Sequence, residues 1–288
     1  MPKNLPKTVV LIAGPTASGK SALAMEMARA ENGVIINADS MQIYAELRLL
    51  TARPSAAEEA QAPHRLYGHV AAIENYSVGH WQKQAMAEVK AAHEDGQTPI
   101  IVGGTGLYFM SLLNGLAEVP EISPEVRNHW RGFAGDLHAE LTKRDTTSAA
   151  KLNPSDRQRL IRALEVIDST GYSLSHWHAA AETHAPLTPF KVQKVFKSVD
   201  RELLGARADA RFDQMLEQGA LDEVRGMPTL DPAAPVMKAI GVREIQSHLK
   251  GEITLDEARR LAQIATRQYI KRQLTWWRGQ MSDWEEVK

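Results

Sequence analysis

Short apolar runs and longer amphipathic runs alternate along about the first hundred residues of the chain. The apolar runs at residues 8–13, 34–36 and 99–102 predict buried strands. The amphipathic stretches at residues 21–30 and 81–94 have apolar or small residues at helical spacing and stop near glycines, which predicts helices. Strands that alternate with helices are typical of an α/β fold with a parallel sheet flanked by helices, whose functional loops lie at the carboxyl ends of the strands.

The pattern changes between residues 123 and 189, where helical spacing continues without a convincing strand. Pro124 and Pro154 are typical of helix starts, and residues 156–170 repeat apolar side chains at helical spacing. We therefore expect a core formed by residues 1–122 and 190–288, interrupted by a helical insertion domain at residues 123–189.

The last hundred residues or so predict one strand followed by helices. Alternation at residues 192–199 indicates a strand that returns to the sheet. Helical spacing then recurs three times, at residues 201–224, 236–249 and 255–278. Thr254 is a candidate N-cap of the last helix, and the acidic tail at residues 283–288 is expected to fray.

The 288 residues are 43% hydrophobic and 24% charged, with a formal net charge of −1, a balance typical of a globular protein. The chain has no cysteine, which excludes disulfides, thiolate nucleophiles, cysteine zinc sites and iron–sulfur clusters. No apolar run approaches the ~20 residues of a membrane helix, so we expect no membrane partner and a cytoplasmic location. Because the net charge is close to zero, contact with nucleic acid requires basic residues concentrated on one face.

A glycine-rich segment follows the first predicted strand and leads into the first predicted helix. It fits the pattern G-x-x-x-x-G-K-[ST] of a phosphate-binding loop, or P-loop, at Gly14, Pro15, Thr16, Ala17, Ser18, Gly19, Lys20 and Ser21. Main-chain N–H groups of such a loop bind a diphosphate, the lysine adds a compact positive charge, and the final hydroxyl suits Mg²⁺. The segment predicts an α/β P-loop core with Ser21 as a Mg²⁺ ligand, a combination usually found in proteins that bind ATP or GTP.

Two more polar residues follow predicted strands and complete the candidate catalytic set with Lys20. Asp39 follows the strand at 34–36, where small-molecule kinases of this architecture place a group that touches the acceptor substrate; alternatively it is a turn or N-cap aspartate. Thr105 lies in a glycine-rich turn after the strand at 99–102. Its hydroxyl and N–H are suited to bind the same anion, although a turn threonine with satisfied hydrogen bonds is the equal alternative.

Basic residues gather on one face of the last predicted helix. Four of them are 7, 4 and 7 residues apart, which places them within about 20° of one line: Arg260, Arg267, Lys271 and Arg278. Such segregation suits the phosphate backbone of a nucleic acid, whereas the alternative is a solvated helix with intrahelical ion pairs. Side chains able to read or stack on bases are interleaved with them, at Gln268, Gln273, Trp276 and Trp277, although most buried tryptophans only pack.

Together these residues resemble one family closely, the bacterial tRNA dimethylallyltransferases. The resemblance covers almost the whole chain and rests on Gly-Pro-Thr-Ala-Ser-Gly-Lys-Ser at 14–21, Asp-Ser-Met-Gln-Ile-Tyr at 39–44, Thr-Ala-Arg-Pro at 51–54, Gly-Gly-Thr-Gly-Leu-Tyr at 103–108, Arg-Ala-Leu-Glu-Val at 162–166 and Ala-Thr-Arg-Gln-Tyr-Ile-Lys-Arg-Gln-Leu-Thr-Trp at 265–276. Many NTPases share the first motif, but its combination with the others in this order is highly specific.

The resemblance implies transfer of a dimethylallyl group from dimethylallyl diphosphate to N6 of the adenosine 3′ of a tRNA anticodon, with Mg²⁺, by a monomer. Asp39 resembles the general base of the family, Thr105 and the loop from Thr16 to Ser21 resemble its diphosphate contacts, and Arg127 resembles an arginine near the tRNA. The insertion domain of the family grips the anticodon stem-loop. Further tRNA-contacting positions are implied at Asp39, Ser40, Met41, Gln42, Thr105, Gln158, Arg159, Leu160, Ile161, Arg162, Lys238, Ala239, Ile240, Gly241, Val242, Arg243, Lys271, Arg272, Gln273, Leu274, Thr275, Trp276, Trp277 and Arg278.

Three positions depart from the family pattern: Leu50 and Arg53 stand where Gly and Lys are usual, and Val242 stands where Tyr is usual. Two other function classes remain as alternatives. One is a P-loop kinase of a nucleoside or other small metabolite, in which Asp39 binds the acceptor. The other is a non-catalytic RNA-binding regulator, which gives Asp39 and the intact P-loop no joint purpose.

Overall fold

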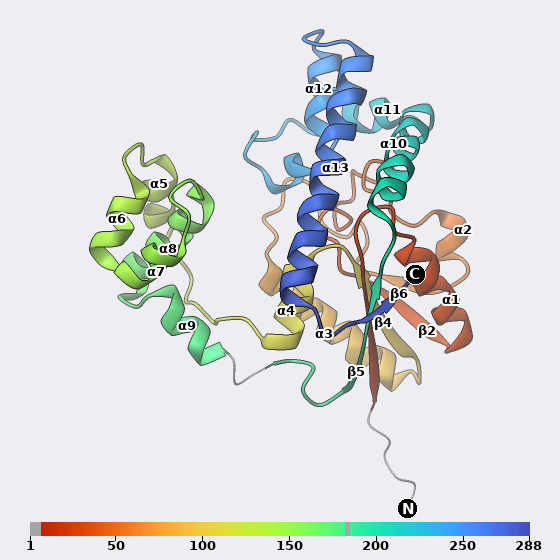
Figure 1. The fold of residues 1–288 in the computed structure, drawn as a ribbon, viewed down its shortest axis with the longest axis horizontal. Helices are drawn as coiled ribbons and strands as arrows, with labels where there is room; N and C mark the ends of the chain where they lie inside the picture. Colours follow the sequence, from red (N-terminus) through yellow and green to blue (C-terminus); the bar gives the residue numbers. More distant parts are fainter. Residues whose placement is uncertain (1–6, 182–184) are drawn as a thin grey trace, which may run out of the picture. The chain divides into compact units, whose positions relative to one another are not determined.

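A computed structural model describes residues 7–181 and 185–288 of the chain (Figure 1). The chain divides into two compact units. The first holds the residues up to Met110 together with those from Pro189 to Lys288, and the second holds Ser111–Thr188. The second unit thus begins earlier in the sequence than residue 123, where we placed the start of the insertion.

The first unit is built around a six-stranded sheet in which every strand pair among the described residues is parallel. Its order is β3-β2-β4-β1-β5-β6, with β1 at Thr8–Ala13, β2 at Gly33–Asn37, β3 at His64–Arg65, β4 at Thr98–Gly103, β5 at Lys191–Lys197 and β6 at Glu285–Val287. This confirms the predicted α/β fold. The expectation that the acidic tail frays is wrong, because residues 285–287 pair with residues 195–197 at the edge of the sheet.

Helices flank the sheet in the first unit (Figure 1). They are α1 (Lys20–Ala30), α2 (Ala56–Glu59), α3 (Val78–Glu94), α4 (Gly106–Asn114, which continues into the second unit), α10 (Arg201–Glu217), α11 (Ala220–Arg225), the 3-10 helix η1 (Pro235–Lys238), α12 (Val242–Leu249) and α13 (Leu255–Gln280). Thr254 caps α13 as predicted, accepting a hydrogen bond from the N–H of Glu257. The predicted helices at 201–224 and 236–249 are each broken in two at a glycine that adopts positive φ.

The core of this unit explains why the short apolar runs become strands. Residues 9–13 of β1 are fully buried, since the sheet is covered on both faces and a parallel strand buried on both sides needs a continuous apolar run. Val10 and Ile12 pack with Ala24 and Ala28 of α1. On α3, Trp81 is fully buried and its indole N–H donates to the main-chain oxygen of Asn37 at 2.8 Å. That bond fixes the end of β2, next to Asp39.

The sheet register brings the three predicted functional loops to one edge. Ala13 at the end of β1 lies opposite Gly103 at the end of β4, and Asn37 at the end of β2 lies opposite Val102. Because β2, β4 and β1 are neighbours and parallel, the P-loop, the Asp39 turn and the Thr105 turn follow adjacent strand ends.

The regular structure among the described residues of the second unit is entirely helical. Its helices are α5 (Pro124–Gly132), α6 (Leu137–Arg144), α7 (Thr146–Lys151), α8 (Arg157–Thr170) and α9 (Leu174–Ala181), packed around buried Trp130, Leu141, Leu160 and Leu164. Pro124 opens α5 as predicted. Pro154 does not begin a helix: it lies in a turn, and α8 starts at Arg157 because Asp156 accepts the N–H of Arg159 as its N-cap. No helix within the described ranges of the chain is long and apolar enough to cross a membrane.

Candidate active site

The P-loop has the local structure that its sequence predicts. It connects the end of β1 to α1, and its backbone curls at Ala17 and Gly19, whose φ angles are 64° and 84°. Ser18, within the loop, is buried, whereas Ser21 is exposed at the start of α1. The first N–H groups of a helix have no intrahelical acceptor and carry partial positive charge, so the loop and helix start are suited to hold an anion.

Lys20 lies in an environment that makes its charge responsive to a ligand. Its Nζ atom donates a hydrogen bond to the main-chain oxygen of Pro15 at 3.3 Å. Burial lowers the pKa of Lys20 to about 8; Asp39 opposes this shift and Arg211 adds to it. An anion beside the ammonium would replace the missing solvation, so this lysine gains charge as it gains a partner.

Asp39 lies in a turn directly after β2. Its main-chain N–H donates to Asn37 Oδ1 at 2.8 Å, and its own Oδ1 accepts the N–H of Met41 at 2.9 Å. It is therefore a turn aspartate, as the alternative interpretation proposed, but the turn uses only Oδ1. No hydrogen bond from the described residues reaches Oδ2, which leaves one carboxylate oxygen for a ligand.

Thr105 is tied to the turn that holds Asp39. Its Oγ1 accepts the N–H of Ser40 at 2.9 Å and donates to Ser40 Oγ at 3.2 Å, while its own N–H donates to Ala38 at 3.1 Å. Its hydrogen bonds are thus satisfied within the protein, as the alternative for this residue proposed. The structure brings Thr105 to the Asp39 turn, and its role as a diphosphate contact stays a prediction.

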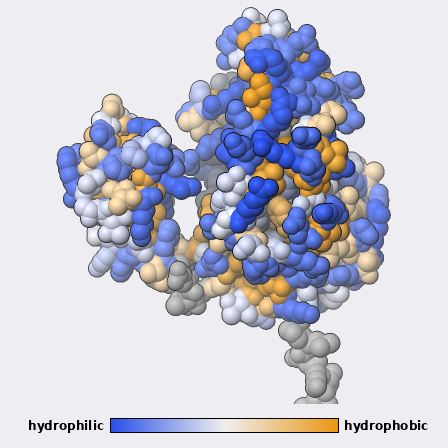
Figure 2. Space-filling model, in the orientation of Figure 1, coloured by the Kyte–Doolittle hydropathy of each residue, from blue (hydrophilic) through white to orange (hydrophobic). Residues whose placement is uncertain are grey.

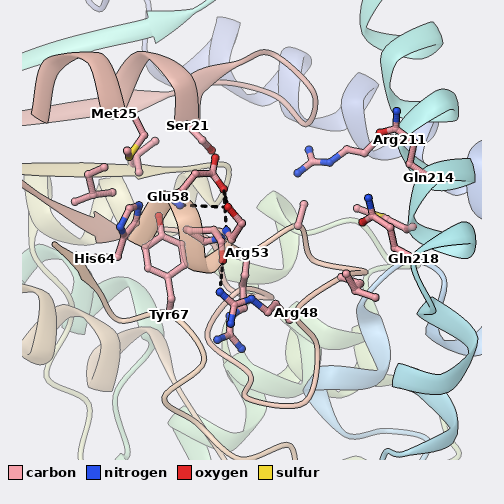
Figure 3. A pocket seen from close by; sticks show the side chains of 17 residues that line it. Ser21, Met25, Arg48, Arg53, Glu58, His64, Tyr67, Arg211, Gln214 and Gln218 are labelled. Atoms are coloured by element: carbon pink, nitrogen blue, oxygen red, sulfur yellow. Dashed lines mark hydrogen bonds between the residues drawn. The ribbon is translucent and has the colours of Figure 1, made fainter. Parts of the chain in front are cut away.

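Two cavities meet beside these residues. The first, of about 360 Å³, is lined by Thr16, Asp39, Ser40 and Met41 together with Lys238, Tyr269 and Arg272, and we call it the Asp39 cavity. The second, of about 300 Å³, is lined by Ser21, Arg48, Arg53, Glu58 and Tyr67 among others, and we call it the Ser21 cavity (Figure 3). Ala52, Arg211 and Met215 line both. The two cavities are therefore neighbouring compartments with a shared wall.

Arg211 is the residue of this site that sequence reasoning missed. It stands on α10, reaches into the Ser21 cavity toward Ser21, and lines the Asp39 cavity as well (Figure 3). Burial lowers its pKa, while Asp39 and Glu58 raise it. An arginine retains its proton in such surroundings. No motif marks Arg211 in the sequence, and only its position on the buried side of an amphipathic helix gave a signal.

Two tyrosines that line the cavities, Tyr67 and Tyr269, are affected by the charge of Asp39. Burial raises the pKa of Tyr67 and of Tyr269, and the negative charge of Asp39 raises both further. Both phenols therefore remain protonated at neutral pH and are hydrogen-bond donors to a ligand in these cavities.

The four aligned basic residues of α13 divide into two that form ion pairs and two that do not. Arg260 pairs with Glu257 of the same helix at 2.7 Å, and Arg267 pairs with Asp209 of α10, so both of these cations are already held in ion pairs. Lys271 and Arg278 are exposed and have no ion pair within the described part of the chain. An open hollow on the C-terminal part of α13 is lined by Gln268, Lys271, Arg272, Thr275 and Trp276. Hydrophilic side chains cover much of the face that α13 presents in Figure 2.

Several positions implied as tRNA contacts have their side chains inside the protein. The side chains of Leu160, Ala239, Val242, Gln273 and Trp277 are buried. Trp277 packs against Phe109, Phe196 and Trp284, and Gln42 donates both of its amide protons to the 51–52 turn. Lys238 and Arg243 are exposed at the two ends of their segment. For side-chain contact with a nucleic acid, the exposed members of these segments are the available ones.

In the second unit, basic side chains gather around one buried carboxylate. Glu165, 5% exposed, lies 3.5 Å from Arg131 and 3.8 Å from Arg162. Burial lowers the pKa of Arg162; the charge of Glu165 opposes this shift, and the charge of Arg127 adds to it. Arg159 is engaged by Asp156 at 3.2 Å. Adjacent cations of this kind are suited to a phosphate group.

The three departures from the family pattern have structural roles. The guanidinium of Arg53 donates to the main-chain oxygens of Tyr44 and Ala45, at 3.0 and 3.1 Å, so it holds a loop at the wall of the Ser21 cavity. Leu50 lines the Asp39 cavity. Val242 is fully buried and packs in a cluster with Ile43 and Leu47.

A metal ion at this site would be held chiefly by the ligand itself. No group of three or more histidine or acidic side chains able to hold a metal occurs in the described ranges. The exposed Ser21 hydroxyl at the wall of the cavity fits the mode in which Mg²⁺ takes one protein oxygen and completes its shell with phosphate oxygens and water.

Comparison with known proteins gives one consistent result. The protein-family profile described as IPP transferase matches residues 42–280. A protein named tRNA dimethylallyltransferase from Rhodopseudomonas palustris (strain BisB18) is 53% identical over 96% of this chain and 90% of its own length. A protein of the same name from Chelativorans sp. (strain BNC1) is 49% identical over 98% of this chain and 99% of its own.

Solved structures agree with the sequence comparisons. A full-length tRNA isopentenylpyrophosphate transferase from Bacillus halodurans is 32% identical and superimposes with a TM-score of 0.69 over 98% of this chain and 90% of that one. A eukaryotic dimethylallyltransferase, described as acting on tRNA, is 29% identical with a TM-score of 0.81 over 94% of this chain and 70% of that one. By its sequence, its fold and the joint placement of the P-loop, Asp39 and Thr105, the chain belongs to the IPP transferase family.

Proposed function

We propose that this protein transfers a dimethylallyl group from dimethylallyl diphosphate to N6 of the adenosine 3′ of the anticodon in tRNA, releasing diphosphate. The observation that carries the proposal is the shared wall of the two cavities. Asp39, with Oδ2 unbonded, lines one of them, Ser21 of the P-loop lines the other, and Arg211 belongs to both. A nucleobase and a diphosphate can therefore meet between the carboxylate and the P-loop.

The reaction replaces a C–O bond with a C–N bond and moves one proton from N6 to the protein. The N6 lone pair of adenine forms the new bond to C1 of the allyl group, and the bond from C1 to the bridging oxygen breaks, leaving its electron pair on diphosphate. The exocyclic amine is a weak base, so its proton has to leave as the new bond forms. Asp39 Oδ2 accepts that proton, while the bond from Met41 to Oδ1 keeps the carboxylate oriented.

Negative charge that develops on diphosphate is met by groups fixed in advance. Ser21 and Arg211 line one cavity, and Lys20 precedes Ser21 at the start of α1, so the P-loop N–H groups, Lys20 and Arg211 are available to stabilise this charge. Such preorganised donors stabilise the transition state more than the ground state. Mg²⁺ bound at Ser21 would neutralise part of the same charge. In this proposal the P-loop binds the diphosphate of a prenyl diphosphate rather than the phosphates of a nucleoside triphosphate.

We propose tRNA contacts in each unit taken by itself, at the exposed cations of α13 and at those of the helical unit. Lys271, Arg272 and Arg278 lie in the segment that also carries the open hollow, and Arg127 with Arg162 offers a second anion site. An adenine within an anticodon loop has to leave its stack to reach Asp39. We extend the proposal to a monomer in the cytoplasm, with residues 123–189 gripping the anticodon stem-loop.

Incubation with dimethylallyl diphosphate labelled in its allyl group and unmodified tRNA tests the proposal. Label should enter tRNA at the adenosine next to the anticodon, and it should enter more slowly by ~10²-fold or more when Asp39→Asn replaces the native enzyme. A parallel reaction with γ-labelled ATP and nucleosides tests the kinase alternative. Phosphorylation of a nucleoside, with no label in tRNA, would show that the protein is a kinase.

A further inference from the structure

Gln273 of α13 connects the P-loop to the turn that precedes Thr105. Its side chain is 6% exposed. Its Oε1 accepts the main-chain N–H of Thr16 at 3.0 Å, and its Nε2 donates to the main-chain oxygen of Gly104 at 3.1 Å. One amide group thus joins two loops that are far apart in the sequence and adjacent in the sheet.

The two bonds continue into a chain of hydrogen bonds that ends at the candidate base. Gly104 precedes Thr105, whose hydroxyl holds the N–H of Ser40, and Ser40 follows Asp39. At the other end, Thr16 opens the part of the loop that resembles the diphosphate contacts. The sheet register brings Asp39 and the P-loop to the same edge, and the Gln273 amide adds a direct link between their loops.

The packing around Gly104 leaves little room for this amide to move. A Cβ atom at Gly104 would lie 2.6 Å from Gln273 Nε2 and 3.5 Å from Asp39 Oδ2. A glycine here lets the amide approach the turn closely and places it near the unbonded carboxylate oxygen. Since Oε1 and Nε2 face a donor and an acceptor respectively, only a group with both functions satisfies both loops.

We propose that Gln273 is a positioning residue for prenyl transfer, which holds Thr16 and Gly104 at the separation that aligns the P-loop with Asp39, and that it does not contact tRNA. This inference rests on the proposed function. It also explains why an amide lies beside exposed basic residues: the neighbouring Lys271 is exposed, while the Gln273 amide is hydrogen-bonded to the two loops.

Two substitutions separate this role from a structural one. Gln273→Met keeps the length and removes both hydrogen bonds. Gln273→Glu keeps an acceptor for the N–H of Thr16. Its ionised carboxylate cannot donate to the Gly104 oxygen and repels it, whereas the protonated carboxyl group can donate again. Gln263→Met is the matched control, because Gln263 lies on the same helix outside the two cavities and donates to Asp213. For each protein we would measure kcat, KM for dimethylallyl diphosphate, Kd for tRNA and Tm.

We expect Gln273→Met to lower kcat/KM for dimethylallyl diphosphate at least tenfold, with the Kd for tRNA within twofold of the native value. The kcat of Gln273→Glu divided by that of the native enzyme should rise as the pH falls from 8 to 6. A weakened tRNA Kd with native kcat would instead assign Gln273 to tRNA contact and overturn the proposal. A lowered Tm with unchanged kinetics, or a flat kcat ratio across pH, would overturn it as well. Absence of transfer by the native enzyme would refute the proposed function itself.

Discussion

The lowered pKa of Lys20 makes the binding of prenyl diphosphate depend on pH in a defined way. In the free protein burial holds this pKa at about 8, so the ammonium is charged below pH 8 and neutral above it. A bound diphosphate raises the pKa: one unit charge at 4 Å with an effective dielectric constant of 20 contributes about 4 kcal/mol, or roughly 3 pKa units. The complex therefore keeps Lys20 protonated throughout the range of interest.

The affinity change follows from these two states. Between pH 7 and pH 9 the free lysine loses its proton while the bound one keeps it, so the Kd for dimethylallyl diphosphate should rise about tenfold. Binding at pH 8 should also take up about half a proton, since half of the free lysines are neutral there. A Kd that rises with pH, and proton uptake on binding, are both expected when a ligand raises the pKa of a base.

Isothermal titration in two buffers with different ionisation enthalpies measures both quantities. Above about pH 7.5 the diphosphate itself is almost fully ionised, so the lysine dominates the proton uptake. Lys20→Arg provides the control, because a guanidinium stays protonated and should flatten the pH dependence even if affinity is lower. A Kd for the native protein that is constant from pH 7 to pH 9, or an equal slope in Lys20→Arg, would refute the assignment of this titration to Lys20.

Three more predictions concern other parts of the molecule. Asp39→Asn keeps the turn but cannot take a proton, so kcat should fall by ~10²-fold or more with the tRNA Kd nearly unchanged, and full activity in single-turnover assays would remove it from the base role. Lys271→Ala should weaken tRNA binding and reduce the slope of log Kd against log salt by about 1; an unchanged slope would place this lysine outside the interface. Gly241→Ala should lower stability by about 1–3 kcal/mol in urea unfolding, because Gly241 has a φ of 98° and a Cβ there would lie 2.9 Å from Leu50 and Phe212. Native stability in that variant would contradict the strain argument.

The parts of the site that could be predicted are those encoded within a few consecutive residues. The P-loop pattern lies between a strand and a helix whose periodicity is visible, so Lys20 and Ser21 were found with their structural context. Asp39 and Thr105 were found because each follows an apolar run, and in a parallel sheet strand ends converge. Local sequence was enough to predict those site residues that lie in short motifs directly after a strand.

The parts that could not be predicted depend on contacts between distant segments. Arg211 is one of many polar residues on an amphipathic helix, and only the packing of α10 brings it to the Ser21 cavity. Helical spacing placed Gln273 among exposed basic neighbours, but it could not show that the loops of β1 and β4 would take both ends of its amide. The tail at 283–288 was misjudged for the same reason: its charges indicate exposure, while its pairing partner, β5, lies far away in the sequence.

The sheet order has a consequence for the biosynthesis of this protein. The central strand β1 is the first to leave the ribosome, yet one of its two partners, β5, begins at Lys191, after the entire helical unit has been made. Until then one side of β1 has unpaired backbone groups beside an apolar surface, which is the kind of nascent edge that aggregates or recruits chaperones. Completion of the core is a late event in translation, so a pause in synthesis between residues 103 and 191 would prolong the period in which the chain is vulnerable.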